Sequence, residues 1–202
     1  MLTTEAQLCN IALLRVGERQ TIDSLEETTE AARACKSLYA PARDACLEEH
    51  WWTFATKRVV LATSTEERAG WEYAFAMPSD CLVPQYIYTG IRNPAPASRL
   101  RFAQELNDAG DGYLILGDFD STTSPLVYTS RIENVRLFPP MFADAVAWRL
   151  AVDLALGLTV KPQVGLAMRQ GYQIALNRAI ASDLRLGEDD VEPDSEFISI
   201  RS

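Results

Sequence analysis

The sequence predicts an α+β fold that is mainly helical. Its core would contain three or four helices from both ends of the chain, with a small antiparallel β-rich insertion. Apolar residues recur at helical spacing in both end segments, while short runs of alternating aromatic residues in the middle are typical of strands. Neither helical set looks complete alone, so we expect the two to pack together. We divide the chain into a helical core (1–57 and 136–186), a β-rich insertion (58–135) and an extended acidic tail (187–202).

Two helices are expected before the insertion. The first should begin at Thr3 or Thr4, because either side chain can cap a helix, and should end at Gly17. In the second, Pro41 either kinks the helix or begins a new one. The apolar positions of the second helix follow the i, i+3, i+4, i+7, i+8 pattern at Ala31, Ala34, Cys35, Leu38 and Tyr39.

The insertion is expected to form one small antiparallel sheet. Trp71, Tyr73, Phe75 and Met77 alternate with smaller or polar residues, which predicts a half-buried strand. The segment 107–112 is rich in Asn, Asp and Gly and should form a turn. The other strand candidates are residues 58–63, 85–89, 99–102, 113–116 and 126–129.

Helical spacing returns after Pro139 and Pro140. The third helix is apolar on most of its faces, which predicts a buried helix, and Gly157 is its expected end. The last helix should begin near Pro162. Its expected inner face contains Ala167, Met168, Gly171, Ile174 and Ala175.

Composition excludes several function classes. The 202 residues carry a formal net charge of -9, which is the wrong sign for gripping nucleic acid phosphates. The four cysteines form no C-x-x-C pair and His50 is the only histidine, so no zinc site is expected. We expect neither a metal nor another cofactor. The N-terminus does not resemble a signal peptide, and no apolar run approaches the roughly 18 residues of a membrane span.

Asp118 and Asp120 form the most enzyme-like motif. The order D-x-D-x-T after an apolar run imitates the phosphatases of the haloacid dehalogenase superfamily, whose two carboxylates also coordinate Mg²⁺. That chemistry needs a parallel α/β sheet, which the remaining sequence cannot build, so we interpret the motif as a strand ending in a polar turn. The same stretch does not fit an EF-hand, because Thr123 stands where that loop needs glycine.

His50, Trp51, Trp52 and Phe54 form the densest aromatic cluster. Aromatic rings can stack on sugars or bases, and the adjacent Glu48 and Glu49 make a glycosidase carboxylate conceivable. Adjacent helical residues point about 100° apart, however, and such a mechanism needs two carboxylates facing each other across a cleft. We therefore favour aromatic packing where the helices meet the sheet, and we expect no catalytic residue.

Several phrases, in order, resemble the tail tubular protein A family of bacteriophage head-to-tail adaptors. The order and spacing of the phrases carry the resemblance, which covers nearly the whole chain. They are residues 6–17 (AQLCNIALLRVG), 22–25 (IDSL), 30–44 (EAARACKSLYAPARD), 50–55 (HWWTFA), 71–82 (WEYAFAMPSDCL) and 142–155 (FADAVAWRLAVDLA).

The resemblance implies a structural subunit of a ring, dodecameric in this family, at the head-tail junction of the virion. Such a ring docks under the portal protein, contacts the downstream tail or nozzle protein, and lets DNA pass without specific binding; before assembly the subunit would lie in the host cytoplasm. The family provides no common catalytic residues. A phage-associated, cell-wall-degrading hydrolase and a generic protein-binding module remain alternative functions.

The last residues and the loop 91–98 match no motif of the family. Six carboxylates between Gly187 and Glu196 are followed by Phe197, Ile198 and Ile200. An apolar end on an acidic tether could add a strand to a partner's sheet, so these three residues are the candidate partner-binding site. A disordered terminus with incidental apolar residues is an equal alternative.

Overall fold

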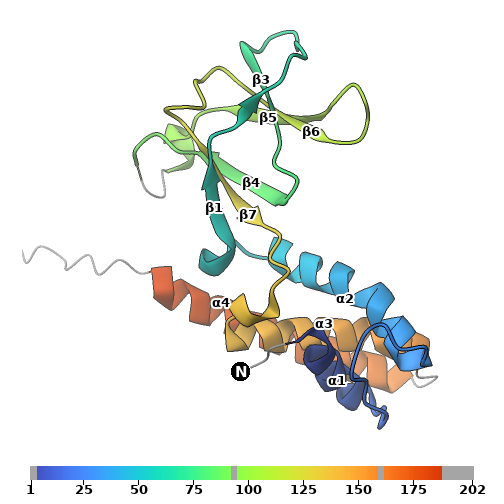
Figure 1. Ribbon diagram of the computed structural model, residues 1–202. Coiled ribbons are helices and arrows are strands. Elements are labelled where there is room, and N and C mark those ends of the chain that lie inside the picture. Colours follow the sequence, from blue (N-terminus) through green and yellow to red (C-terminus); the bar gives the residue numbers. More distant parts are fainter. Residues whose placement is uncertain (1–3, 92–94, 159–161, 188–202) are drawn as a thin grey trace, which may run out of the picture.

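The computed structural model describes residues 4–91, 95–158 and 162–187, and Figure 1 shows a sheet module projecting from a helical module. The helical module contains α1 (Glu5–Val16), α2 (Glu30–Glu48), α3 (Pro140–Leu158) and α4 (Pro162–Gly187). The sheet module contains the strands between α2 and α3. The α+β fold predicted from the sequence, mainly helical and with antiparallel sheets, is confirmed.

Side-chain caps fix where α1 and α2 begin. Thr4 accepts a hydrogen bond from the backbone N–H of Gln7, and Thr29 accepts one from that of Ala32. At the other end of α1, Gly17 has a φ of 91°, a left-handed conformation that glycine adopts without steric cost. Pro41 lies inside α2, which continues through it to Glu48.

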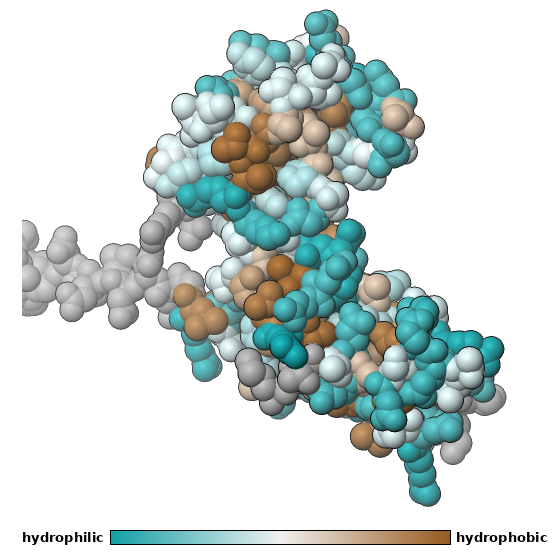
Figure 2. All heavy atoms as spheres, in the orientation of Figure 1, coloured by the Kyte–Doolittle hydropathy of each residue, from teal (hydrophilic) through white to brown (hydrophobic). Residues whose placement is uncertain are grey.

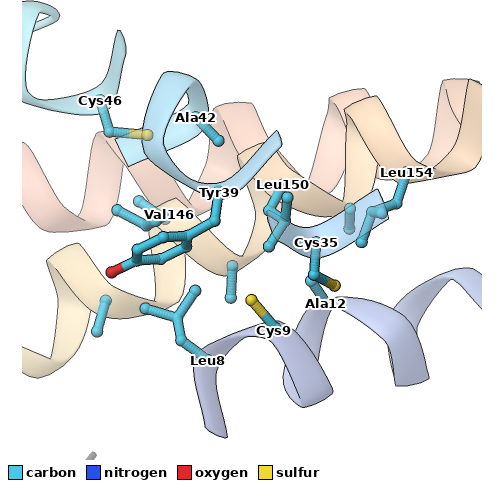
Figure 3. Close-up of a cluster of buried hydrophobic side chains, with 14 of the residues drawn as sticks. Leu8, Cys9, Ala12, Cys35, Tyr39, Ala42, Cys46, Val146, Leu150 and Leu154 are labelled. Carbon is cyan, nitrogen blue, oxygen red and sulfur yellow. The ribbon is translucent and has the colours of Figure 1, made fainter. Parts of the chain in front are cut away.

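α3 is the central helix of the module. It packs against α1, α2 and α4, which explains why it is apolar on most of its faces. Val146 and Leu150 point from α3 towards Tyr39 of α2 and Leu8 of α1, and Leu154 lies further along α3, on the side of Cys35 (Figure 3). The helix passes Gly157, its expected end, and finishes at Leu158.

The inner face of α4 is partly different from the predicted one. Met168 and Ala175 are buried as expected, but Ala167 and Ile174 are exposed. The true inner face also contains Leu176, Ala179 and Asp183. The sequence did not reveal this shift, because α4 contacts α3 on one side only and carries apolar residues on its outer side as well.

The strands form two antiparallel sheets, so the prediction of a single sheet is wrong. The first has the order β1-β7-β4, from β1 (Thr56–Val59), β7 (Leu126–Ser130) and β4 (Cys81–Ile87). The second has the order β2-β3-β6-β5, from β2 (Ala62–Thr63), β3 (Tyr73–Ala76), β6 (Tyr113–Gly117) and β5 (Phe102–Leu106). The predicted strand 58–63 is therefore divided between the two sheets. Short 3-10 helices lie at η1 (Thr53–Ala55), η2 (Pro96–Ser98) and η3 (Val135–Leu137).

The two sheets share one apolar core. It contains Leu61, at the crossing from β1 to β2, and members of both sheets such as Phe75, Ile115 and Leu126. The other face of the second sheet also has a small buried cluster, formed by Ala74, Leu114 and Leu116. Consecutive residues of β3 are therefore buried on opposite faces, which corrects the prediction of a half-buried strand.

Candidate functional site

Asp118 and Asp120 are structural groups of the turn between β6 and β7. A carboxylate oxygen of Asp118 accepts a hydrogen bond of 2.9 Å from the backbone N–H of Glu72. Asp120 accepts hydrogen bonds from the backbone N–H of Thr122 at 2.8 Å and from its hydroxyl at 2.7 Å. These bonds lower the pKa of Asp120. The strand before them lies in an antiparallel sheet, so the parallel surroundings of the phosphatase motif are missing from the described fold.

The aromatic cluster packs where the helices meet the sheets, as predicted. Trp52 is buried, and its ring meets those of His50 and Phe142 edge-on with centroids 4.9 Å away in both cases. Its indole N–H donates a hydrogen bond to the carbonyl of Cys46. Trp51 turns the other way and packs edge-on against Tyr86 of β4. The two adjacent rings thus connect the core of one module to a strand of the other.

Asp183 of α4 fixes the chain where it leaves the helical module towards β1. Its carboxylate, which is buried, accepts hydrogen bonds from the backbone N–H of Thr53 at 3.1 Å and from the Thr53 hydroxyl at 2.6 Å. Nε2 of His50 lies 3.4 Å from the same carboxylate but does not have hydrogen-bond geometry. A buried carboxylate is stable only when hydrogen-bonded, so this contact fixes the position of the η1 segment relative to α4.

A second carboxylate acts where the chain returns from β7 to the helices. Asp44 of α2 is bound by Arg131 at 2.9 Å and by the neighbouring Arg43, which is 5% exposed, at 2.7 Å. Both covalent connections between the modules are therefore held by carboxylates that come from the helices. This pairing orients the sheet module relative to the helical module.

Asp80, the residue just before β4, ties the start of that strand to β1 and β7. Its carboxylate accepts hydrogen bonds from Lys57 of β1 at 2.6 Å, and from Tyr128 at 3.0 Å and Ser130 at 2.9 Å, both of β7. Partial burial raises the pKa of Asp80, but the three hydrogen bonds outweigh it, and the net pKa lies below the ordinary value. The pKa of Tyr128 is raised mainly by burial and, to a smaller extent, by its hydrogen bond to Asp80.

All four cysteines are free and buried, as expected for small apolar side chains. Burial raises the pKa of Cys46 to about 12 and that of Cys81 to about 12. Cys9 of α1 faces Cys35 of α2 (Figure 3). A hydrogen bond to Cys35, together with burial, raises the pKa of Cys9. The thiols of Cys9, Cys46 and Cys81 are therefore poor nucleophiles and poor metal ligands. The same hydrogen bond lowers the pKa of Cys35, but the Cys35 side chain is fully buried.

The described residues contain no group of three or more His, Cys, Asp and Glu side chains arranged to hold a metal ion. None of the helices in that part of the chain is both long enough and apolar enough to cross a bilayer. A small depression lies at the end of α4, lined by apolar groups such as Trp52, Met141 and Phe142 together with Asp183. Its one carboxylate is already bound by Thr53, and Ser182 is the other small polar side chain in its lining.

Residues from separate phrases of the sequence contact one another. Arg15 of α1 forms an ion pair with Asp144 of α3, and its guanidinium carbon lies 4.1 Å from the centre of the Trp148 ring. Asn10 exchanges hydrogen bonds of 2.8 and 2.9 Å with the backbone of Ile22, which fixes the connection after α1. Polar residues that look unrelated in sequence therefore form one framework.

Sequence reasoning found the aromatic cluster but missed Asp183, Asp44 and Asp80. Apart from Arg43 beside Asp44, the partners of these carboxylates lie 23 to 130 positions away, so no local pattern could reveal how they join the modules. Phe197, Ile198 and Ile200, the candidate partner-binding residues, lie outside the described residues, as does part of the loop 91–98. No protein-family model matches the chain, and no curated protein matches it.

Proposed function

We propose that this chain is a structural adaptor subunit of a tailed bacteriophage, which forms a ring between portal and tail and continues the DNA channel. The observation that carries the proposal is the framework joining the phrases that resemble tail tubular protein A. Arg15 of the first phrase pairs with Asp144 of the last, and Trp52 of the fourth packs on Phe142 of the last. The resembling residues thus act together to build one architecture.

The distribution of polar groups supports a structural role. The hydrogen-bonding capacity of Asp183, Asp44 and Asp80 is used to fix the two modules and their strands. An assembly subunit needs a rigid shape and large surfaces, since neighbours in a ring must repeat one geometry. The net charge of -9 suits a ring whose channel DNA passes without adhering.

Electron microscopy of the purified protein mixed with the portal protein of the same phage tests the proposal. We expect the isolated protein to be monomeric or weakly associated, and to form a ring, a dodecamer in the virion, only on the portal. Portal particles that remain bare at saturating protein would contradict the proposal. So would light scattering that reveals a tight, stable dimer of the isolated protein.

A further inference from the structure

A line of uncharged side chains runs along the outward face of α4. Residues 166, 170, 174, 177, 181 and 184 follow the helical repeat and point away from α3. At 1.5 Å per residue, the line from Leu166 to Leu184 is about 27 Å long. We call it the α4 stripe; its members, all exposed, are Gln163, Leu166, Gln170, Gln173, Ile174, Asn177, Ala181 and Leu184.

The α4 stripe is not explained by the fold of one chain. Leu166 is 63% exposed, Ile174 54% and Leu184 57%, although the inner face of the same helix already packs on α3. The exposed side of α2 carries instead the charged residues Glu30 and Lys36, which is usual for a solvated helix. Aligned exposed apolar residues interspersed with amides are typical of a surface that another protein covers. Figure 2 shows apolar groups at the surface of both modules on the face it presents.

The charges beside the stripe indicate what covers it. Arg169, Arg178 and Arg185 flank the stripe, and Asp183, the only acidic residue of α4, is buried. The connection between α1 and α2 has the opposite character. Residues 18–30 contain five carboxylates and one arginine, and they follow Leu14, which is 60% exposed on α1. One chain therefore carries two complementary surfaces: exposed apolar residues flanked by arginines on α4, and an exposed leucine beside a mainly acidic connection on α1.

We propose that the α4 stripe of one copy packs against Leu14 and the acidic connection 18–30 of the next copy. The inference rests on the proposed function, since it names the contact that would repeat around the ring. The two surfaces are different, so the contact is heterologous, and its repetition can close a ring rather than end at a dimer. A contact between one helix and one connection buries less surface area than a standard protein interface. Association should therefore be weak until a portal holds the copies side by side.

Two single variants and their mixture test the contact without a portal. Ile174→Glu places a carboxylate opposite the acidic connection, and Leu14→Lys places a cation opposite the arginines. Both positions are exposed, so the fold is retained, which melting followed by circular dichroism verifies.

In sedimentation velocity near millimolar protein, we expect wild type to associate and each variant to remain monomeric. An equimolar mixture associates again, because each variant supplies the surface that the other lacks. Leu106→Glu, at a residue 57% exposed on β5, is the matched control and associates as wild type does.

Each other outcome counts against the contact. Wild type that stays monomeric at these concentrations, variants that associate normally, or a mixture that remains monomeric would overturn it. Variants that self-associate but no longer bind portals would reassign the stripe to the portal, which also overturns the proposal. Failure of the adaptor function looks different: wild type would associate through this contact and still leave portals bare. Variants that complete portal rings at normal yield would refute the contact and leave the adaptor function standing.

Discussion

Single carboxylates at the junction of the modules carry specific structural roles. In Asp183→Ala, the backbone N–H and hydroxyl of Thr53 lose their acceptor. Thr53 is itself exposed, so water can replace part of the lost hydrogen bonding. We expect the free energy of unfolding to fall by about 1–2 kcal/mol. Asp183→Asn keeps one acceptor oxygen and should lose less. Urea denaturation measures both variants, and equal losses would contradict the role of the accepted hydrogen bonds.

Asp80 should make stability depend on pH. Its pKa is lower in the folded chain than in the unfolded chain, so its contribution is fully present above the unfolded pKa of about 3.9 and is lost as pH falls through the folded pKa. The difference in unfolding free energy between wild type and Asp80→Asn should therefore be largest above about pH 5 and shrink below about pH 4. Lys57→Met should remove only part of this dependence, since Ser130 and Tyr128 remain. A difference that stays constant across this range would show that Asp80 does not titrate as expected.

Asp118 and Asp120 should be dispensable for chemistry. Both carboxylates hold backbone groups of a turn in an antiparallel sheet. Under the proposed adaptor function, we expect a phage that carries Asp118→Asn and Asp120→Asn together to infect nearly as well as wild type, apart from any folding defect. Infectivity and Mg²⁺-dependent phosphatase activity are the two measurements. Phosphatase activity present in wild type and absent from the variant would overturn this prediction.

At the scale of elements, two glycines of α4 should respond oppositely to the same change. A Cβ added at Gly171 would lie 2.5 Å from the ring of Trp148, closer than real contacts allow, whereas at Gly165 it would meet nothing within 4 Å. Gly171→Ala should push α4 away from α3 and lower the melting temperature. Gly165→Ala should raise stability by about 0.5–1 kcal/mol, because alanine loses less backbone entropy in a helix. Thermal unfolding of both variants checks this, and two changes of the same sign would contradict the close approach at Gly171.

The elements differ in how far the sequence could predict them. The start of α1 at Thr4 and its end at Gly17 depend on side-chain capping and glycine φ, which are local and readable. The arrangement of the strands was not readable. The apolar run around Leu61 looks like one strand, but the chain changes sheets there, and only contacts with Phe75 and Ile115 decide it. Likewise, the outward position of Ile174 depends on where α3 lies, which no helical period reveals.

At the scale of the whole molecule, the two modules have separate apolar cores of different size. Cys9, Cys35 and Cys46 lie in the large core of the helices, and Cys81 lies in the smaller core between the sheets. The junction ties the modules through Trp51, Trp52 and the carboxylates Asp44 and Asp183, but it does not merge the two cores. Cooperative units of unfolding commonly coincide with such separate cores, so the sheet module should open first.

Thiol labelling can follow this opening, because each core contains its own cysteine. In the folded protein at neutral pH, we expect no labelling by a small thiol reagent, since all four side chains are buried and burial raises the pKa of Cys46 and of Cys81 to about 12. With rising urea, Cys81 should react before Cys9, Cys35 and Cys46, because less apolar surface protects the sheet core. Mass spectrometry of the labelled peptides identifies each site, with fully unfolded protein as the control for equal intrinsic reactivity. Simultaneous labelling of all four thiols would mean that the junction couples the modules into one cooperative unit.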